Sequence, residues 1–269
     1  MARWSSAKET VVVAVRNWRL WLLQFVANAA IFLAFVAWLR FPDAHWWQLI
    51  LQLFLVLLIA VAVLVLQGGT LNYYESAHQV KTASLSPAFL KAFKHTAAIA
   101  VLAFLVHFFE HLIGHLAHYQ QTFPGYLRSG FPAWLRRMIA ESALDNAYAL
   151  LLFMLVWVVL PGLLLPFALF ASSRGFRGLV AFADWRRAIA NLLYWIALVV
   201  AAVIGVGSSG LIMSWKLNPK SATLAGEQAS LAIRLFFAYL LAIFAWLLTC
   251  SVVGRRATRS SGEASSQPQ

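Results

Sequence analysis

Four histidines crowd one short apolar stretch of the sequence, at His107, His111, His115 and His118, with Glu110 among them. On an α-helix, at about 100° per residue, the imidazoles fall within an arc of roughly 80°, and Glu110 lies about 60° to one side. Imidazoles four residues apart can share a Zn, Cu or Fe ion, and residues 107–111 match in letters an inverted zinc-protease motif. His107, Glu110, His111 and His115 are therefore the candidate metal ligands.

A complete metal site needs more ligands than this stripe supplies. The other apolar runs carry no histidine, and only Glu141 and Asp145 stand near the start of a neighbouring run. Bis-imidazole haem would need a facing histidine from a second copy of the chain. In a second interpretation the role is structural, and His107 and Glu110 form hydrogen bonds with each other or with a neighbouring helix. In a third interpretation the stripe handles protons or substrate. We predict no cofactor, with Zn, Cu, Fe or haem as the alternative.

A second candidate for chemistry is the segment Gly207-Ser208-Ser209-Gly210, which resembles the Gly-x-Ser-Gly motif of rhomboid-type intramembrane proteases. A dyad of Ser209 and His115 would supply a nucleophile and a base. Rhomboid proteases carry the catalytic histidine on a later span than the serine, whereas no histidine follows Ser209 here. Small residues also allow helices to pack closely, so we expect this segment to serve helix packing. The sequence thus favours a protein that is not an enzyme.

The elements that must position these residues are long apolar runs. The chain is 62% hydrophobic and only 11% charged, and a run of about 20 apolar residues can cross roughly 30 Å of hydrocarbon as a helix. Strands of a membrane barrel would alternate apolar and polar residues, whereas these runs are apolar on every face. We predict an all-α, polytopic transmembrane helical bundle over residues 1–254 and a disordered tail over 255–269. The six spans are expected at about 20–39, 46–66, 96–118, 148–170, 188–213 and 231–253.

The formal net charge of +12 is explained by topology. The basic residues form no nucleic-acid-binding motif, so no nucleic-acid partner is expected. With the N-terminus inside, most of the 21 Lys and Arg residues fall in inner segments, which is the bias expected of a bacterial cytoplasmic membrane protein with both termini in the cytoplasm.

Three inner segments share a design in which basic and aromatic residues lead directly into an odd-numbered span. They are residues 16–19, 91–94 and 184–187. They predict helices at the cytoplasmic membrane interface and suggest a threefold repeat of one interfacial helix plus two spans. The alternative is that membrane surfaces generally collect aromatic residues and cations.

Two prolines in the fourth run, Pro161 and Pro166, remove backbone donors and should kink or break that helix near the middle of the membrane. Broken helices can form transport sites, whereas an ordinary kink is the simpler alternative. Polar side chains at Asn28, Asn72 and Asn191 could link spans by hydrogen bonds.

Several short motifs suggest a family. They are Gly68-Gly69-Thr70 at the end of a span, Ser86-Pro87-Ala88-Phe89, Leu160-Pro161 with Leu165-Pro166, and Gly175-Phe176. The pattern resembles uncharacterised bacterial six-span membrane proteins related to the membrane domain of some glycerophosphodiester phosphodiesterases. The resemblance implies a six-span membrane domain. It does not imply hydrolysis, because the soluble phosphodiesterase domain of that group has no counterpart in this sequence.

Together these patterns predict a non-enzymatic integral membrane protein with a role in transport or in the assembly of membrane complexes. The alternative is a membrane metalloprotein, haem protein or intramembrane enzyme that uses the histidine stripe. The expected partners are the lipid bilayer and either other membrane proteins or a second copy of the chain.

Overall fold

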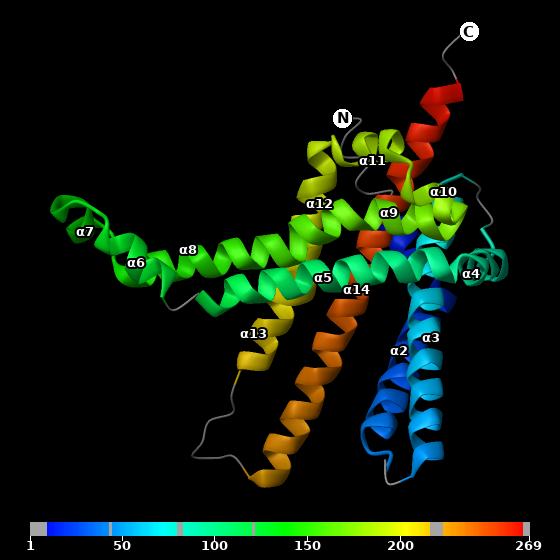
Figure 1. Ribbon diagram of the computed structural model, residues 1–269, viewed down its shortest axis with the longest axis horizontal. Coiled ribbons are helices and arrows are strands. Elements are labelled where there is room, and N and C mark those ends of the chain that lie inside the picture. Colours follow the sequence, from blue (N-terminus) through cyan, green and yellow to red (C-terminus); the bar gives the residue numbers. More distant parts are fainter. Residues whose placement is uncertain (1–9, 43–44, 80–82, 120–121, 216–222, 266–269) are drawn as a thin grey trace.

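The computed structural model describes residues 10–42, 45–79, 83–119, 122–215 and 223–265, and within these ranges every regular element is a helix (Figure 1). Six helices of the described chain are long and apolar enough to cross a membrane. The predicted all-α, polytopic fold is therefore confirmed, and the chain is a multi-pass integral membrane protein. The six are α2 (Trp18–Leu39), α3 (Trp46–Gln79), α5 (Thr96–His118), α8 to α9 (Ser142–Arg174), α12 to α13 (Leu192–Ser214) and α14 (Leu224–Arg255).

Two of these helices are interrupted by a π-helical turn. The fourth consists of α8 (Glu141–Met154), η2 (Leu155–Val159) and α9 (Leu160–Arg174). The fifth consists of α12 (Leu192–Ala202), η3 (Val203–Gly207) and α13 (Ser208–Ser214). Short helices fill the connections, namely α4 (Leu85–Lys94), α6 (Phe123–Ser129), α7 (Ala133–Met138), α10 (Phe176–Leu179) and α11 (Phe182–Ile189).

Two helices extend well past the apolar runs that predict them. α3 continues from the predicted end at Leu66 to Gln79 because its polar residues there, such as Thr70 and Asn72, are buried against other helices. α14 runs through Ser265, which differs from the disordered tail predicted from Arg255 onward. Alanine and arginine, which occur in residues 255–259, favour helix. Residues 266–269 of the predicted tail lie outside the described residues.

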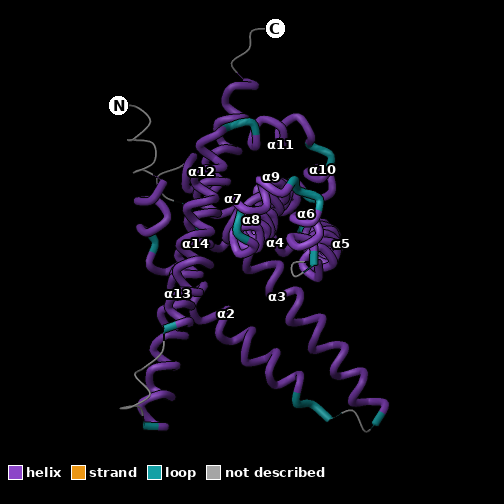
Figure 2. The backbone as a smooth tube through the Cα atoms, turned by 90° about the vertical axis from the view of Figure 1, so that its left-hand side faces the viewer, coloured by secondary structure: helices purple, strands orange, loops and turns teal. Residues whose placement is uncertain are grey.

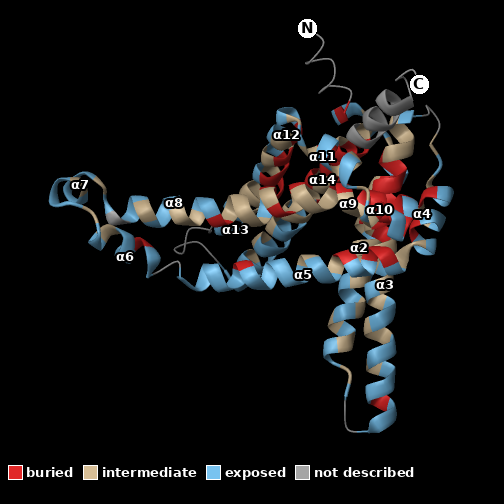
Figure 3. Cartoon of the chain, turned by 45° about the horizontal axis from the view of Figure 1, so that its top comes forward, coloured by how far each residue is buried: buried red, intermediate tan, exposed pale blue. Residues whose placement is uncertain are grey.

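The best-packed region lies where α3, α9, α12 and α14 meet, and we call it the hub. It contains Leu71, Phe170, Tyr194, Leu247 and Cys250, all of which are almost completely buried. The helices lose their neighbours with distance from the hub, so that the far parts of α2, α3 and α5 are mostly exposed (Figure 3). Exposed apolar side chains are expected on surfaces that face lipid.

Three helical hairpins extend from the hub (Figures 1 and 2). The α2–α3 hairpin and the α13–α14 hairpin point away from it to the same side. The hairpin of α5 with α8 and α9 lies crosswise to both. The candidate spans thus do not share one axis, and an inside corner forms where the crosswise hairpin meets the upright helices.

A short helix precedes the first span of each hairpin. The three are the helix at residues 10–16, α4 and α11. The chain turns from each short helix into the span at Asn17, His95 or Asn191, and both asparagines cap the following helix with their side-chain oxygen. Asparagine is among the preferred N-cap residues because it accepts a hydrogen bond from the first free N–H groups.

The packing around these turns repeats as well. Three residues before each turn there is a buried alanine, and three residues after it there is a buried residue of varied size. The alanines are Ala14, Ala92 and Ala188, and the following residues are Leu20, Ala98 and Tyr194. In the first and third units a tryptophan donates its indole N–H back to the short helix, Trp21 to the Ala14 carbonyl and Trp195 to the Ile189 carbonyl. These equivalences agree with a threefold repeat.

Candidate functional site

The joint between α8 and α9 is built around Pro161. An α-helix would pair the N–H of residue 161 with the carbonyl of Trp157, but proline has no N–H. The N–H of Leu160 instead donates to the carbonyl of Leu155, five residues back, and the chain forms the π-turn η2. π-turns inside α-helices are frequent at functional sites.

Pro166 creates a second orphan group, which another helix satisfies. Its missing N–H leaves the carbonyl of Gly162 without its helical partner, and the Tyr194 hydroxyl of α12 donates to that carbonyl at 2.7 Å. The indole N–H of Trp185 in α11 donates to the neighbouring Leu163 carbonyl at 2.7 Å. α9 therefore continues through Pro166 without a break, and the two hydrogen bonds join α9 to α11 and α12.

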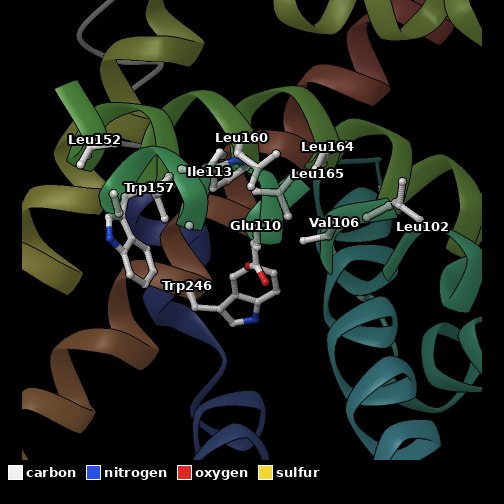
Figure 4. A pocket seen from close by; sticks show the side chains of 15 residues that line it. Leu102, Val106, Glu110, Ile113, Leu152, Trp157, Leu160, Leu164, Leu165 and Trp246 are labelled. Carbon is white, nitrogen blue, oxygen red and sulfur yellow. The ribbon is translucent and has the colours of Figure 1, made fainter. Parts of the chain in front are cut away.

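A cavity of ≈510 Å³ lies between α5, the η2–α9 segment and α14, at the inside corner (Figure 4). α5 lines it with Leu102, Val106 and Ile113, and the opposite wall includes Leu160 and Leu164. Its lining is apolar except for Glu110 and two tryptophans. Cavities of this size and character are typical of small-molecule sites.

The polar or aromatic side chains at the cavity are Glu110 and two tryptophans, Trp157 of η2 and Trp246 of α14. Glu110 is the one ionisable residue among those that line the cavity. None of the hydrogen bonds or ion pairs within the described residues involves its carboxylate. The indole Nε1 of Trp246 is buried and likewise has no acceptor in the described chain. Because the carboxylate has no partner among the described residues, it is the group with which a molecule in the cavity could pair.

The histidine stripe lies outside this cavity. His107, His111 and His115 are exposed on α5 and line neither of its cavities. The structure brings together His111 and His115, whose Nε2 atoms are 3.3 Å apart. In the described residues no three His, Cys, Asp or Glu side chains gather as a metal site would require. Glu110 is exposed as well, but it is the one member of this group that lines the first cavity.

The remaining candidates also have definite places. Asp145 is exposed on α8, and the side chain of Glu141 lies outside what the structure describes. The hydroxyl of Ser209 donates to the Ala238 carbonyl of α14 at 3.2 Å. That bond joins α13 to α14, as expected for a packing role.

A second cavity of ≈600 Å³ lies against the other side of the α5–α9 contact. Leucines and aromatic side chains make up its wall, including Leu105, Leu112, Phe167 and Trp185, and no ionisable residue lines it. Of these two cavities, only the first is lined by an ionisable residue.

The sequence indicates Glu110 but not the cavity. Gly114 and Ala117 follow Glu110 at helical spacing and line the same cavity, and this face of small residues is the signal that could have marked it. Trp246 is more than a hundred residues away in the chain, so no local pattern connects it to Glu110. Comparisons of the chain with protein-family models, with curated proteins and with solved structures found no match.

Proposed function

We propose that the protein is a non-enzymatic membrane carrier that binds an amphiphilic small molecule in the cavity between α5, α9 and α14. One observation carries the proposal: an apolar cavity of ≈510 Å³ is lined by a single carboxylate, that of Glu110, which no described residue pairs. A ligand with an apolar body and one polar group would fill the space and pair with the carboxylate.

The position of the cavity supports transport over a role in membrane assembly. The cavity lies at the corner where the crosswise hairpin meets α14. A change in the angle between the hairpin and the upright helices would alter the walls of the cavity and the access to it. Alternating access in transporters works by such rocking of one group of helices against another around a fixed site. The π-turn before Pro161 is a suitable place for part of that motion.

The distribution of basic residues supports an orientation for the carrier. The hub side carries the basic short helices, including Lys91 and Lys94 of α4 and Arg186 and Arg187 of α11. The positive-inside rule then assigns the hub and both termini to the cytoplasm, and the tips of the α2–α3 and α13–α14 hairpins to the outer side of a bacterial cytoplasmic membrane. The resemblance to bacterial six-span membrane proteins supports the same location.

The test is to identify the small molecules that copurify with the protein by mass spectrometry. Gly114 lines the cavity, and a Cβ added there would meet nothing within 4 Å, so Gly114→Leu projects a side chain into open space. Gly210 of α13 has the same free surroundings but lies outside the cavity, which makes Gly210→Leu the matched control.

We expect wild-type protein and Gly210→Leu to retain the same amphiphile, and Gly114→Leu to lose at least about nine tenths of it, since 1.4 kcal/mol of lost binding is a factor of ten. Equal retention in both variants would show that the molecule is bound elsewhere. The melting temperature of Gly114→Leu should equal that of the wild type, because a destabilised protein could lose the amphiphile for reasons other than a blocked cavity. Copurification of a second membrane protein without any amphiphile would favour the assembly role instead.

A further inference from the structure

We infer that the cavity between α5, α9 and α14 selects a lipophilic cation, a molecule with an apolar body and one positive charge, for which Glu110 is the counter-ion. The inference rests on the proposed function and adds the sign of the charge that the ligand carries.

The first argument is the charge of the cavity wall. Glu110 contributes its one ionisable group, and no Lys, Arg or His is among the lining residues. Glu110 is an exposed residue of the candidate span α5, and a carboxylate within a membrane span is costly unless an opposite charge or a hydrogen-bond donor accompanies it. Because no described residue pairs with Glu110, a positive ligand would supply the partner, whereas an anionic ligand would be repelled.

The second argument is the aromatic wall beside the carboxylate. Trp246 and Trp157 line the same cavity from two different helices (Figure 4). The face of an indole attracts cations, with estimates of about 0.5–2 kcal/mol depending on how far the pair is desolvated. A carboxylate together with indole rings in one apolar space is thus suited to a cation with little water around it. Neutral and anionic molecules gain less from the same wall.

The third argument is the contrast with the second cavity. That cavity shares Leu102, Ile113, Leu160 and Leu164 with the first, has a similar volume, and has no ionisable lining residue. Both cavities can therefore take apolar molecules, but a preference for positive charge is expected at the first alone. The exposed carboxylate of Asp145 on α8 lies outside both cavities and provides a control for charge in general.

The experiment compares two probes of matched size and opposite charge, tetraphenylphosphonium and tetraphenylborate. Binding is measured by scintillation proximity with the full chain in phosphatidylcholine nanodiscs, and the signal of empty nanodiscs is subtracted. The variants are Glu110→Gln, which removes the charge with little change in shape, and Asp145→Asn as its control. Glu110→Met is held as a second neutral variant in case the glutamine protein does not fold. Gly114→Leu reports on the cavity itself.

We expect tetraphenylphosphonium to bind wild type and Asp145→Asn alike, and to bind Glu110→Gln at least about tenfold more weakly. Tetraphenylborate should bind the wild type more weakly than the cation does. Unchanged cation binding in Glu110→Gln, no cation binding to the wild type, or a preference for the anion would each overturn the inference. If the copurified amphiphile is nevertheless lost in Gly114→Leu, the proposed function stands while the inference on charge fails. If Gly114→Leu changes neither result, both fail.

Discussion

Asn72 of α3 and Ser172 of α9 bind each other through two hydrogen bonds inside the hub. The Asn72 Nδ2 donates to the Ser172 carbonyl at 3.2 Å, and the Ser172 hydroxyl donates to the Asn72 Oδ1 at 2.9 Å. The same Nδ2 also donates to the Ala88 carbonyl of α4 at 3.3 Å. One buried amide thus joins α3 of the first hairpin to two helices of the second unit, the short helix α4 and the span that ends in α9.

Replacement of this amide should weaken the whole molecule. Asn72→Ala leaves the buried Ser172 hydroxyl with one partner fewer and removes the donor to the Ala88 carbonyl, and we expect a loss of about 1–3 kcal/mol of stability. Cys250 is the one cysteine of the sequence and is fully buried in the hub. The temperature at which a thiol-reactive dye labels Cys250 therefore reports on opening of the hub. Ser214→Ala, which removes an exposed hydroxyl bonded within its own helix, should leave that temperature unchanged. Similar labelling curves for both variants would contradict the assignment of Asn72.

Two glycines should respond in opposite ways to the same substitution. A Cβ on Gly254 of α14 would lie 2.7 Å from backbone atoms of Tyr74 and Glu75 in α3, so Gly254→Ala must separate these helices. A Cβ on Gly114 would meet nothing within 4 Å, and Gly114→Ala should stabilise α5 by up to about 1 kcal/mol because alanine favours helix. The labelling temperature of Cys250 should fall for the first variant and be equal or higher for the second. A rise for Gly254→Ala would contradict the close helix contact.

The pairing of the Tyr194 hydroxyl with the Gly162 carbonyl can be tested by a double-mutant cycle. Tyr194→Phe removes the donor and leaves a buried carbonyl unsatisfied, which costs about 1–3 kcal/mol. Pro166→Ala restores a backbone N–H at residue 166, which can donate to the Gly162 carbonyl. Tyr194→Phe should therefore cost much less in the Pro166→Ala background than in the wild type. Equal costs in both backgrounds would mean that the tyrosine does not replace the missing helical donor.

The metal prediction for the histidine stripe is tested by elemental analysis and an optical spectrum of purified protein. Two imidazoles from His111 and His115 make an incomplete zinc site, so we expect a chelator wash to remove any bound metal and no haem absorption to be present. Metal that survives the wash in wild type and is lost in both His107→Ala and His111→Ala would instead establish a metalloprotein. That result would require further ligands, for example from a second copy of the chain.

The spans were predictable from the sequence because hydropathy acts locally. A run such as residues 148–170 contains no charged residue and no histidine, so its placement in the membrane is enough to predict a helix. The extension of α3 to Gln79 could not be read in this way, since it depends on burial of Asn72 and its neighbours by other helices.

The site was predictable only in part, for a related reason. Glu110 is conspicuous as a carboxylate in an apolar run, and helical geometry gives the face on which it lies. That geometry does not say which helix covers the face. The direction of the crosswise hairpin and the approach of Trp246 are set by tertiary contacts, such as Gly162 against the ring of Trp195. Patterns of hydrophobicity within one helix carry no information on those contacts.

The contact between the two ends of the described chain has a consequence for biosynthesis. Thr10 accepts a hydrogen bond from the Ser251 hydroxyl through its carbonyl, and its own hydroxyl accepts one from the Arg255 guanidinium. The helix at residues 10–16 therefore cannot reach its final neighbours until the ribosome has made the last span. During translation the earlier hairpins remain in the bilayer while the hub is incomplete, and in that state they are exposed to membrane proteases. Slower elongation should lengthen that exposure and lower the yield of mature protein.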